Sequence, residues 1–202
     1  MTYNSYMNDT KLTIANALLN LLKTQPLNKI TVTQITKESN LTRQTFYRNF
    51  EDKEDLLGCI AESWVDVILR KLTEAFRVSD GSYYESMKLW MSQALENDIS
   101  REVWKVYKRV MEEEDFTRKS KMGALQFKAS PKWRQVIEEC YGHMDQSRYP
   151  GLTPEKLAYA VDMGLLAMVQ LSMRYVEHYA PLAELKEAAW HQLTILDKGI
   201  RE

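Results

Sequence analysis

The chain has 202 residues, enough for one ordinary domain or two small domains that share a core. Hydrophobic residues make up 45% of it and charged residues 27%, as in soluble globular proteins. Seven glycines, five prolines and a net charge of −1 argue against a hairpin-rich β protein and against a uniformly basic or acidic chain.

The cysteines and the apolar runs bear on where the protein works. Cys59 and Cys140 lie far apart without a Cys-x-x-Cys pair, so we expect neither a disulfide framework nor a thiolate zinc site. The first residues lack the pattern of a signal peptide. The longest uncharged apolar run, Met163–Met173, is shorter than the roughly 18 residues that a membrane span needs. We therefore expect a cytoplasmic protein that does not enter a membrane.

The charge is unevenly distributed along the chain. Residues 1–50 hold six basic and two acidic residues, a balance of +4. The other 152 residues hold 21 basic and 26 acidic residues, a balance of −5. A basic N-terminal module on an acidic body is a weak indication of nucleic-acid binding.

Four helices are predicted in the first part of the chain. Apolar residues at steps of three and four predict a helix over residues 9–24, before Pro26. Thr31 can form a capping box with Gln34 and start a short helix that ends near residue 39. A third helix runs from about residue 42 to 49. Asp52 can cap a fourth, which continues to about residue 77.

Helical patterns continue to the C-terminus. We predict helices at roughly 83–97, 100–114, 118–129 and 131–144, followed by a linker over residues 143–156. Thr153 caps a long helix from Pro154 to about Tyr179, and a last helix runs from about Pro181 to Ile200. The sequence therefore predicts an all-α fold of about nine or ten helices.

The second and third predicted helices, separated by a short turn, match a helix-turn-helix. At 100° per residue, Phe46 and Phe50 lie on one face of the third helix, which can pack on the first two. The opposite side and its flanks carry polar groups that can bond bases or phosphates: Gln44, Thr45, Tyr47 and Arg48. The alternative is a helix that is polar only because it faces water.

Residues 30–57, "ITVTQITKESNLTRQTFYRNFEDKEDLL", resemble the DNA-binding segment of TetR-family transcriptional repressors. The similarity rests on a capped helix, a turn, an aromatic pair, a phenylalanine and a lysine that opens helix four. These are Thr31–Ser39, Asn40–Leu41, Phe46–Tyr47, Phe50 and Lys53. The resemblance covers about the first 60 residues, and the remainder is similar only in its helical layout. It implies a three-helix DNA-binding head, residues 1–52, and a larger regulatory and dimerisation body, residues 53–202.

The resemblance also implies roles for individual residues. Thr33 would lie near phosphate at the start of helix two, and Lys53 would bind phosphate at the start of helix four. The recognition surface would comprise Thr42, Arg43, Gln44, Thr45, Tyr47 and Arg48. Asn40 stands where the family usually has glycine, but asparagine tolerates a positive φ best among the other residues. Thr36 replaces a common alanine, so we expect local repacking.

The last two predicted helices are candidates for a dimer interface. Apolar residues at helical spacing and small residues that permit close approach favour pairing with a second copy in a four-helix arrangement. The predicted interface residues are Leu165, Met168, Ser172, Ala189, Leu193 and Leu196. Alternatively, these helices form only the core of one chain. A palindromic operator, which needs two heads, favours the dimer.

The middle of the chain is rich in Trp and Met, which suit an adaptable apolar pocket but are also common in cores. The candidate pocket residues are Trp90, Trp104, Tyr107, Met111 and Met168. That a pocket exists at all is an expectation from the resemblance. A small apolar or amphipathic effector would bind there.

The histidines, His143, His178 and His191, lack metal-ligand spacing, so we expect neither a metal nor another cofactor. No catalytic or phosphate-binding fingerprint is present, so we predict that the protein is not an enzyme. The resemblance implies a homodimeric repressor released from operator DNA by a small molecule. One alternative is a regulator or co-activator controlled by a protein partner, and a more distant one is an all-α enzyme.

Overall fold

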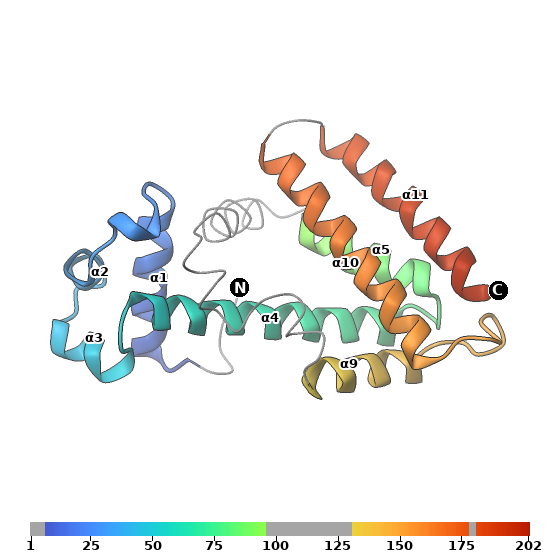
Figure 1. The fold of residues 1–202 in the computed structure, drawn as a ribbon, viewed down its shortest axis with the longest axis horizontal. Coiled ribbons are helices and arrows are strands. Elements are labelled where there is room, and N and C mark those ends of the chain that lie inside the picture. Colours follow the sequence, from blue (N-terminus) through green and yellow to red (C-terminus); the bar gives the residue numbers. More distant parts are fainter. Residues whose placement is uncertain (1–6, 96–130, 178–180) are drawn as a thin grey trace. The chain divides into compact units, whose positions relative to one another are not determined.

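The computed structural model describes residues 7–95, 131–177 and 181–202 (Figure 1). Within these ranges all of the regular secondary structure is helical, which confirms the all-α prediction. The described elements, eight α-helices and one 3-10 helix, are α1 Asp9–Leu22, η1 Leu27–Lys29, α2 Val32–Glu38, α3 Arg43–Asn49, α4 Lys53–Val78, α5 Tyr83–Leu95, α9 Pro131–Gly142, α10 Pro154–Val176 and α11 Leu182–Arg201. The helices predicted at 100–114 and 118–129 lie outside the described residues.

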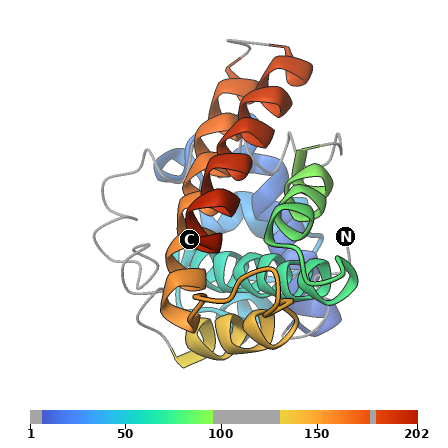
Figure 2. The same cartoon turned by 90° about the vertical axis from the view of Figure 1, so that its right-hand side faces the viewer.

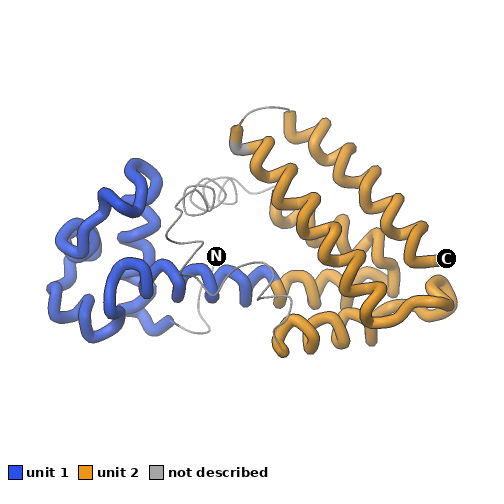
Figure 3. Tube along the Cα trace, viewed as in Figure 1, with its two compact units in different colours: residues 1–68, 105–127 blue, residues 69–104, 128–202 orange. Residues whose placement is uncertain are grey.

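The chain divides into two compact units, and the division falls inside α4, between Ile68 and Leu69 (Figure 3). The described residues of the first unit, called the head below, are 7–68. Those of the second unit, called the body, are 69–95, 131–177 and 181–202. The domain boundary between residues 52 and 53 stays a prediction.

Side-chain caps fix where the head helices begin. The Thr31 hydroxyl accepts the Gln34 backbone N–H at 3.2 Å, and the Gln34 side chain accepts the Thr31 backbone N–H at 2.8 Å. This confirms the predicted capping box at the start of α2. Asp52 accepts the backbone N–H of Asp55 at 2.7 Å and so caps α4, as predicted.

A single apolar cluster holds the head together. Ile14 and Leu18 of α1, Ile35 of α2, Phe46 of α3 and Leu56 of α4 are all fully buried in it. Burial of one such side chain stabilises a fold by about 1.5–3 kcal/mol. The four head helices therefore form one packed unit, which fixes the orientation of α3.

The turn between α2 and α3 depends on Asn40, whose φ of 54° lies in the left-handed region. The backbone N–H of Leu41 then reaches the carbonyl of Thr36 at 3.0 Å and closes the end of α2. Asparagine therefore fills the place expected for glycine. Thr36 is buried, and its hydroxyl donates to the carbonyl of Thr33 at 3.1 Å, which satisfies the extra polar atom within the helix.

In the body, α10 and α11 lie side by side and α5 packs against both (Figures 1 and 2). Thr153 caps α10 by accepting the backbone N–H of Lys156, as predicted. Gly164 permits the close approach of α5, because a Cβ there would lie 2.5 Å from the terminal methyl of Met87. The three helices thus share one core.

A buried polar cluster joins the ends of several body helices. The Tyr149 hydroxyl donates to Asp197 at 2.5 Å and accepts the Tyr83 backbone N–H at 3.0 Å. Arg201 donates to the other Asp197 oxygen at 2.8 Å and lies 4.8 Å from the Tyr149 ring centroid. Burial, together with the hydrogen bond to Asp197, raises the pKa of Tyr149 above its usual value.

Candidate nucleic-acid interface

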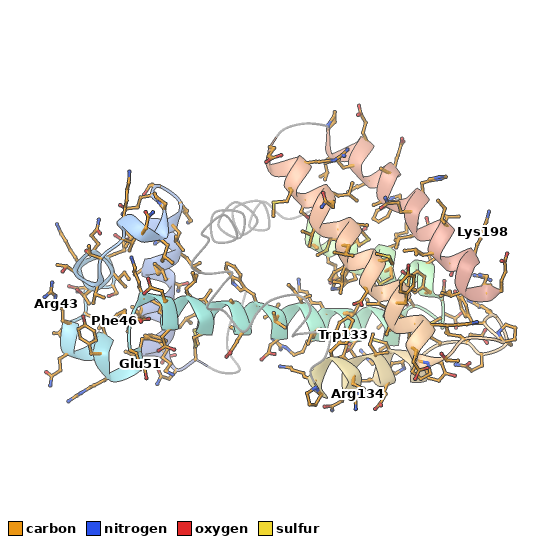
Figure 4. All side chains as sticks on the ribbon, viewed as in Figure 1. Arg43, Phe46, Glu51, Trp133, Arg134 and Lys198 are labelled. Carbon is orange, nitrogen blue, oxygen red and sulfur yellow. The ribbon has the colours of Figure 1, made fainter. Side chains whose placement is uncertain are left out.

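The seven-residue helix α3 is held by its apolar side. Thr42 caps it, and Phe46 and Phe50 are buried, with ring centroids 5.9 Å apart. Figure 4 shows Phe46 directed toward the other head helices, while Arg43 extends away from them. The predicted orientation of α3 within the head is therefore present in the structure.

Three polar side chains form the exposed face of α3. Gln44 and Arg48 are exposed, and Tyr47 is 58% exposed although it is a large aromatic residue. The Phe46 ring packs against the Tyr47 ring edge to face, with centroids 5.4 Å apart, and so limits how that ring can turn. Within the described part of the chain, none of the three has a hydrogen bond or an ion pair. Their donors and acceptors are available to a ligand.

Two threonines of the predicted surface are engaged within α3. The Thr42 hydroxyl accepts the backbone N–H of Thr45 at 3.1 Å and lies 2.9 Å from the Thr45 hydroxyl. Thr42 is exposed, whereas Thr45 is half-buried. A cap satisfies an otherwise free N–H of the first turn, so the first role of this pair is to start the helix.

Arg43 and Thr33 connect the two helices of the helix-turn-helix. The guanidinium of Arg43, the first residue of α3, donates a hydrogen bond to the hydroxyl of Thr33 in α2. Thr33 and Arg43 are both exposed. A guanidinium has five N–H donors, so this bond leaves Arg43 free to contact a phosphate or a base as well.

Lys53 lies in a different setting from that expected of a surface phosphate ligand. Its ammonium donates to the backbone carbonyls of Leu27 at 2.8 Å and Ile30 at 2.9 Å. Its side chain is only 19% exposed, and Glu54 lies 3.9 Å from the ammonium. The structure therefore directs the charge of Lys53 toward the turn that precedes α2.

The structure buries four of the six predicted dimer-interface residues within one chain: Met168, Ser172, Ala189 and Leu193. Leu165 and Leu196 are half-buried. The apolar residues that α10 and α11 expose are others, which the sequence analysis did not single out: Tyr159 (66% exposed), Leu166 (46%) and Ile195 (58%). A seven-residue step between Tyr159 and Leu166 was the available sequence signal.

The candidate pocket residues are only partly described. Trp90 and Met168 are each 2% exposed and belong to the body core. Trp104, Tyr107 and Met111 lie outside the described residues. One turn beyond Met168, the buried Ser172 hydroxyl has no hydrogen-bond partner among the residues that the structure describes. Buried polar groups without a protein partner are uncommon and mark places where a water or ligand can bind.

Metal-binding clusters and membrane-spanning helices are both absent from the described ranges. No group of three or more His, Cys, Asp or Glu side chains there could hold a metal ion. None of the described helices combines the length and apolarity needed to cross a membrane.

The segment that contains the helix-turn-helix is similar to a known protein family. Residues 14–59, which include α2 and α3, match the family model described as "Bacterial regulatory proteins, tetR family". This match confirms the resemblance that residues 30–57 indicate. No curated protein sequence matched the chain.

Solved structures extend the likeness over nearly the whole chain. A transcriptional regulator of Rhodococcus sp. Rha1 has a TM-score of 0.66 at 16% identity, over 95% of this chain and 98% of its own. A TetR-family regulator of Rhodococcus sp. has a TM-score of 0.68 at 12% identity, over 94% and 100%. The dihydroxyacetone kinase operon activator DhaS has a TM-score of 0.55 at 16% identity, over 95% and 98%. At these identities the likeness establishes the fold.

Proposed function

Because its N-terminal segment belongs to the tetR family of bacterial regulatory proteins and its fold is that of TetR-family regulators, we propose that this chain reads operator DNA through the exposed face of α3. One observation carries the proposal. The side chains of Gln44, Tyr47 and Arg48 are exposed together and have no hydrogen-bond or ion-pair partner within the described chain, on a short helix whose other face is buried in the head core. A helix of this size fits the major groove of B-DNA.

Gln44, Arg48 and Tyr47 are suited to different contacts with DNA. The Gln44 amide can bond the N6 and N7 positions of adenine, and the Arg48 guanidinium can bond O6 and N7 of guanine. The Tyr47 hydroxyl can donate to a phosphate, and its ring can contact a thymine methyl. Arg43 and Thr33, at the junction of α2 and α3, would bond the backbone and set the register.

Thr42 and Thr45 have a smaller part in this proposal. Their hydroxyls already cap α3, so any phosphate contact that they make is shared with the cap. Either could still accept or donate one further hydrogen bond, since a hydroxyl has one donor and two acceptor positions.

A homodimer would deliver two such heads to a palindromic site. The exposed apolar residues of α10 and α11, which are Tyr159, Leu166 and Ile195, support an interface on these helices. Leu165 and Leu196 can contribute as half-buried neighbours. The four buried residues of the predicted interface would contribute to dimerisation only indirectly, because they hold α10 and α11 together within one chain.

We favour a repressor whose DNA binding is controlled by a small apolar or amphipathic effector. Binding of the effector would release the repressor from its operator. The hydroxyl of Ser172, one turn from Met168 on α10, has no hydrogen-bond partner among the described residues, which supports a binding position in the body core. An effector that binds one conformation of the body better would shift the population of DNA-competent dimers.

A regulator controlled by a protein partner is the second candidate. The name of the structurally similar DhaS describes an activator, so this fold serves activation as well as repression. In that case the exposed apolar face of α10 and α11 would receive a protein other than a second copy. An all-α enzyme is the most distant alternative.

The experiment that separates these candidates is a titration of fluorescent duplex DNA, drawn from the region upstream of the gene, with the purified protein. A DNA-reading regulator gives tight binding that competitor DNA of random sequence does not abolish, with a strong decrease in affinity as salt rises. Binding without sequence preference, or no binding, would contradict the proposal. Screening apolar metabolites for release of the DNA then distinguishes an effector from a protein partner.

A further inference from the structure

We propose that Lys53 is a positioning residue, which fixes the start of α2 from the first turn of α4, and that it does not bind the DNA backbone. The inference rests on the proposed DNA-binding function, because what Lys53 positions is the helix-turn-helix. It concerns only residues of the head. It reverses the role that the resemblance implies for this lysine.

The argument begins with the ammonium and its acceptors. An ammonium has three N–H donors, and Lys53 uses two of them on the carbonyls of Leu27 and Ile30, at 2.8 and 2.9 Å. Hydrogen bonds from a charged donor are about twice as strong as neutral ones. The side chain is 19% exposed, so most of it is already removed from solvent. Little of its capacity remains for an additional ligand.

The carbonyls of Leu27 and Ile30 lie in the segment that leads into α2. Leu27 is the first residue of η1 and Ile30 directly follows its last residue, and both side chains are buried in the head core. The Ile30 carbonyl immediately precedes Thr31, the capping residue of α2. By holding both carbonyls, Lys53 restrains the direction in which the chain enters α2. The direction of α2 in turn sets the Thr33–Arg43 contact with α3.

Lys53 differs from the nearby Lys29 in how many N–H donors of its ammonium are already used by the protein. Lys29 lies in η1 and is exposed, and its ammonium has no ion pair or hydrogen bond within the described chain. A lysine of that kind is suited to a phosphate, because all three N–H donors of its ammonium are available to a ligand. Lys53 would have to give up two carbonyl bonds or share its single remaining N–H.

The test compares Lys53→Met with Lys29→Met, which removes the same charge from the exposed side of η1. Both are measured by amide hydrogen exchange and by DNA binding across a salt series, at a temperature where both are fully folded. For Lys53→Met we expect exchange of the amides of residues 31–35 to accelerate and DNA affinity to fall, each by about tenfold, as for the loss of a charged hydrogen bond. We expect the dependence of log affinity on log salt to keep the slope of the unmutated protein. Lys29→Met should leave amide exchange unchanged.

A phosphate contact makes the opposite prediction. Loss of one such contact reduces the salt slope by about one. A slope reduced by that amount in Lys53→Met, or unchanged amide exchange, would overturn the proposal. Because lower affinity is measured on fully folded protein, simple loss of stability cannot produce it.

A measurement on the unmutated protein covers the case in which Lys53→Met does not fold. The Nζ resonance of Lys53 should show slow proton exchange and should not shift when duplex DNA is added. A shift on adding DNA would identify a phosphate ligand and overturn the inference. If no duplex is bound at all, the proposed function fails separately, and amide exchange in Lys53→Met still decides whether Lys53 holds the start of α2.

Discussion

Arg43 of α3 donates a hydrogen bond to the hydroxyl of Thr33 in α2, so the two helices of the helix-turn-helix share a polar contact at the surface of the head. The contact sits at the edge of the face formed by Gln44, Tyr47 and Arg48. The hydrogen bond orients the Arg43 guanidinium in the absence of DNA. Such an orientation would lower the entropic cost of the proposed DNA binding.

Arg43→Ala should weaken DNA binding and reduce the salt slope by about one, as for a lost backbone contact. The free energy of unfolding should change by no more than about 0.5 kcal/mol, because the side chain is exposed. Anisotropy titrations and urea unfolding measure the two quantities. Affinity that stays the same at matched salt would remove Arg43 from the interface.

Gln44→Ala and Arg48→Ala should each change which base pair is preferred at one operator position, with about 1–3 kcal/mol of discrimination lost. Tyr47→Phe should weaken binding more uniformly, since a hydroxyl on phosphate carries no sequence information. Arg134→Ala, on the exposed side of α9 in the body, is the matched control (Figure 4). If Arg134→Ala alters base preference as much as Arg48→Ala does, α3 is not the reading helix.

Asn40→Ala should destabilise the head by about 1–2 kcal/mol, because the φ of 54° is costly for a residue that is neither glycine nor asparagine. Asn40→Gly should be neutral or slightly stabilising at the same position. Urea denaturation followed by circular dichroism compares them. Equal stability of the two variants would mean that the turn does not hold this backbone conformation in solution.

Leu166→Glu should dissociate the proposed dimer and leave each chain folded, because Leu166 is 46% exposed. Leu193→Glu should instead unfold the body, because a carboxylate would replace a side chain that is 1% exposed. Sedimentation and circular dichroism separate the two outcomes. Gln135→Glu on α9 controls for added charge on the body surface. A Leu166→Glu variant that still sediments as a dimer would move the interface elsewhere.

Tyr149→Phe should cost about 1–3 kcal/mol, since it removes the donor to a buried Asp197 oxygen. It should also change the response to alkali. The pKa of Tyr149 is higher in the folded than in the unfolded chain. The contribution of its protonated hydroxyl to the free energy of unfolding is therefore present below about pH 10 and is lost as pH rises through the folded pKa.

Unfolding free energies measured from pH 8 to 11, about two units below and one above the ordinary tyrosine pKa, test this sign. The difference between the unmutated chain and Tyr149→Phe should shrink toward the alkaline end. Tyr159→Phe, at a residue that is 66% exposed, is the control and should show no such trend. A difference that grows with pH would contradict the assignment.

The local features of the fold followed from the sequence. Thr31, Gln34 and Thr153 act through bonds to residues three positions away, so a short pattern contains all the information needed. The left-handed Asn40 was likewise predictable, because few residue types tolerate that backbone conformation. The exposed face of α3 followed from helical periodicity alone.

Contacts between distant residues could not be predicted in this way. Lys53 bonds carbonyls 26 and 23 residues earlier, and backbone acceptors leave no trace in the sequence. On α11, Leu193 is buried and Ile195 is 58% exposed, although both are branched aliphatic residues. Helical spacing places residues on a common face but does not say whether the same chain or a second copy covers that face.

Selection of bound duplexes from a pool of random sequence, followed by interference mapping with guanine N7 methylation, tests the central claim most directly. The account predicts an enriched inverted repeat in which methylation of guanine N7, a major-groove atom, blocks binding. It also predicts that replacing Gln44, Tyr47 and Arg48 together by alanine abolishes the enrichment. Enrichment of no sequence, or an enriched site indifferent both to N7 methylation and to these replacements, would contradict DNA reading by α3.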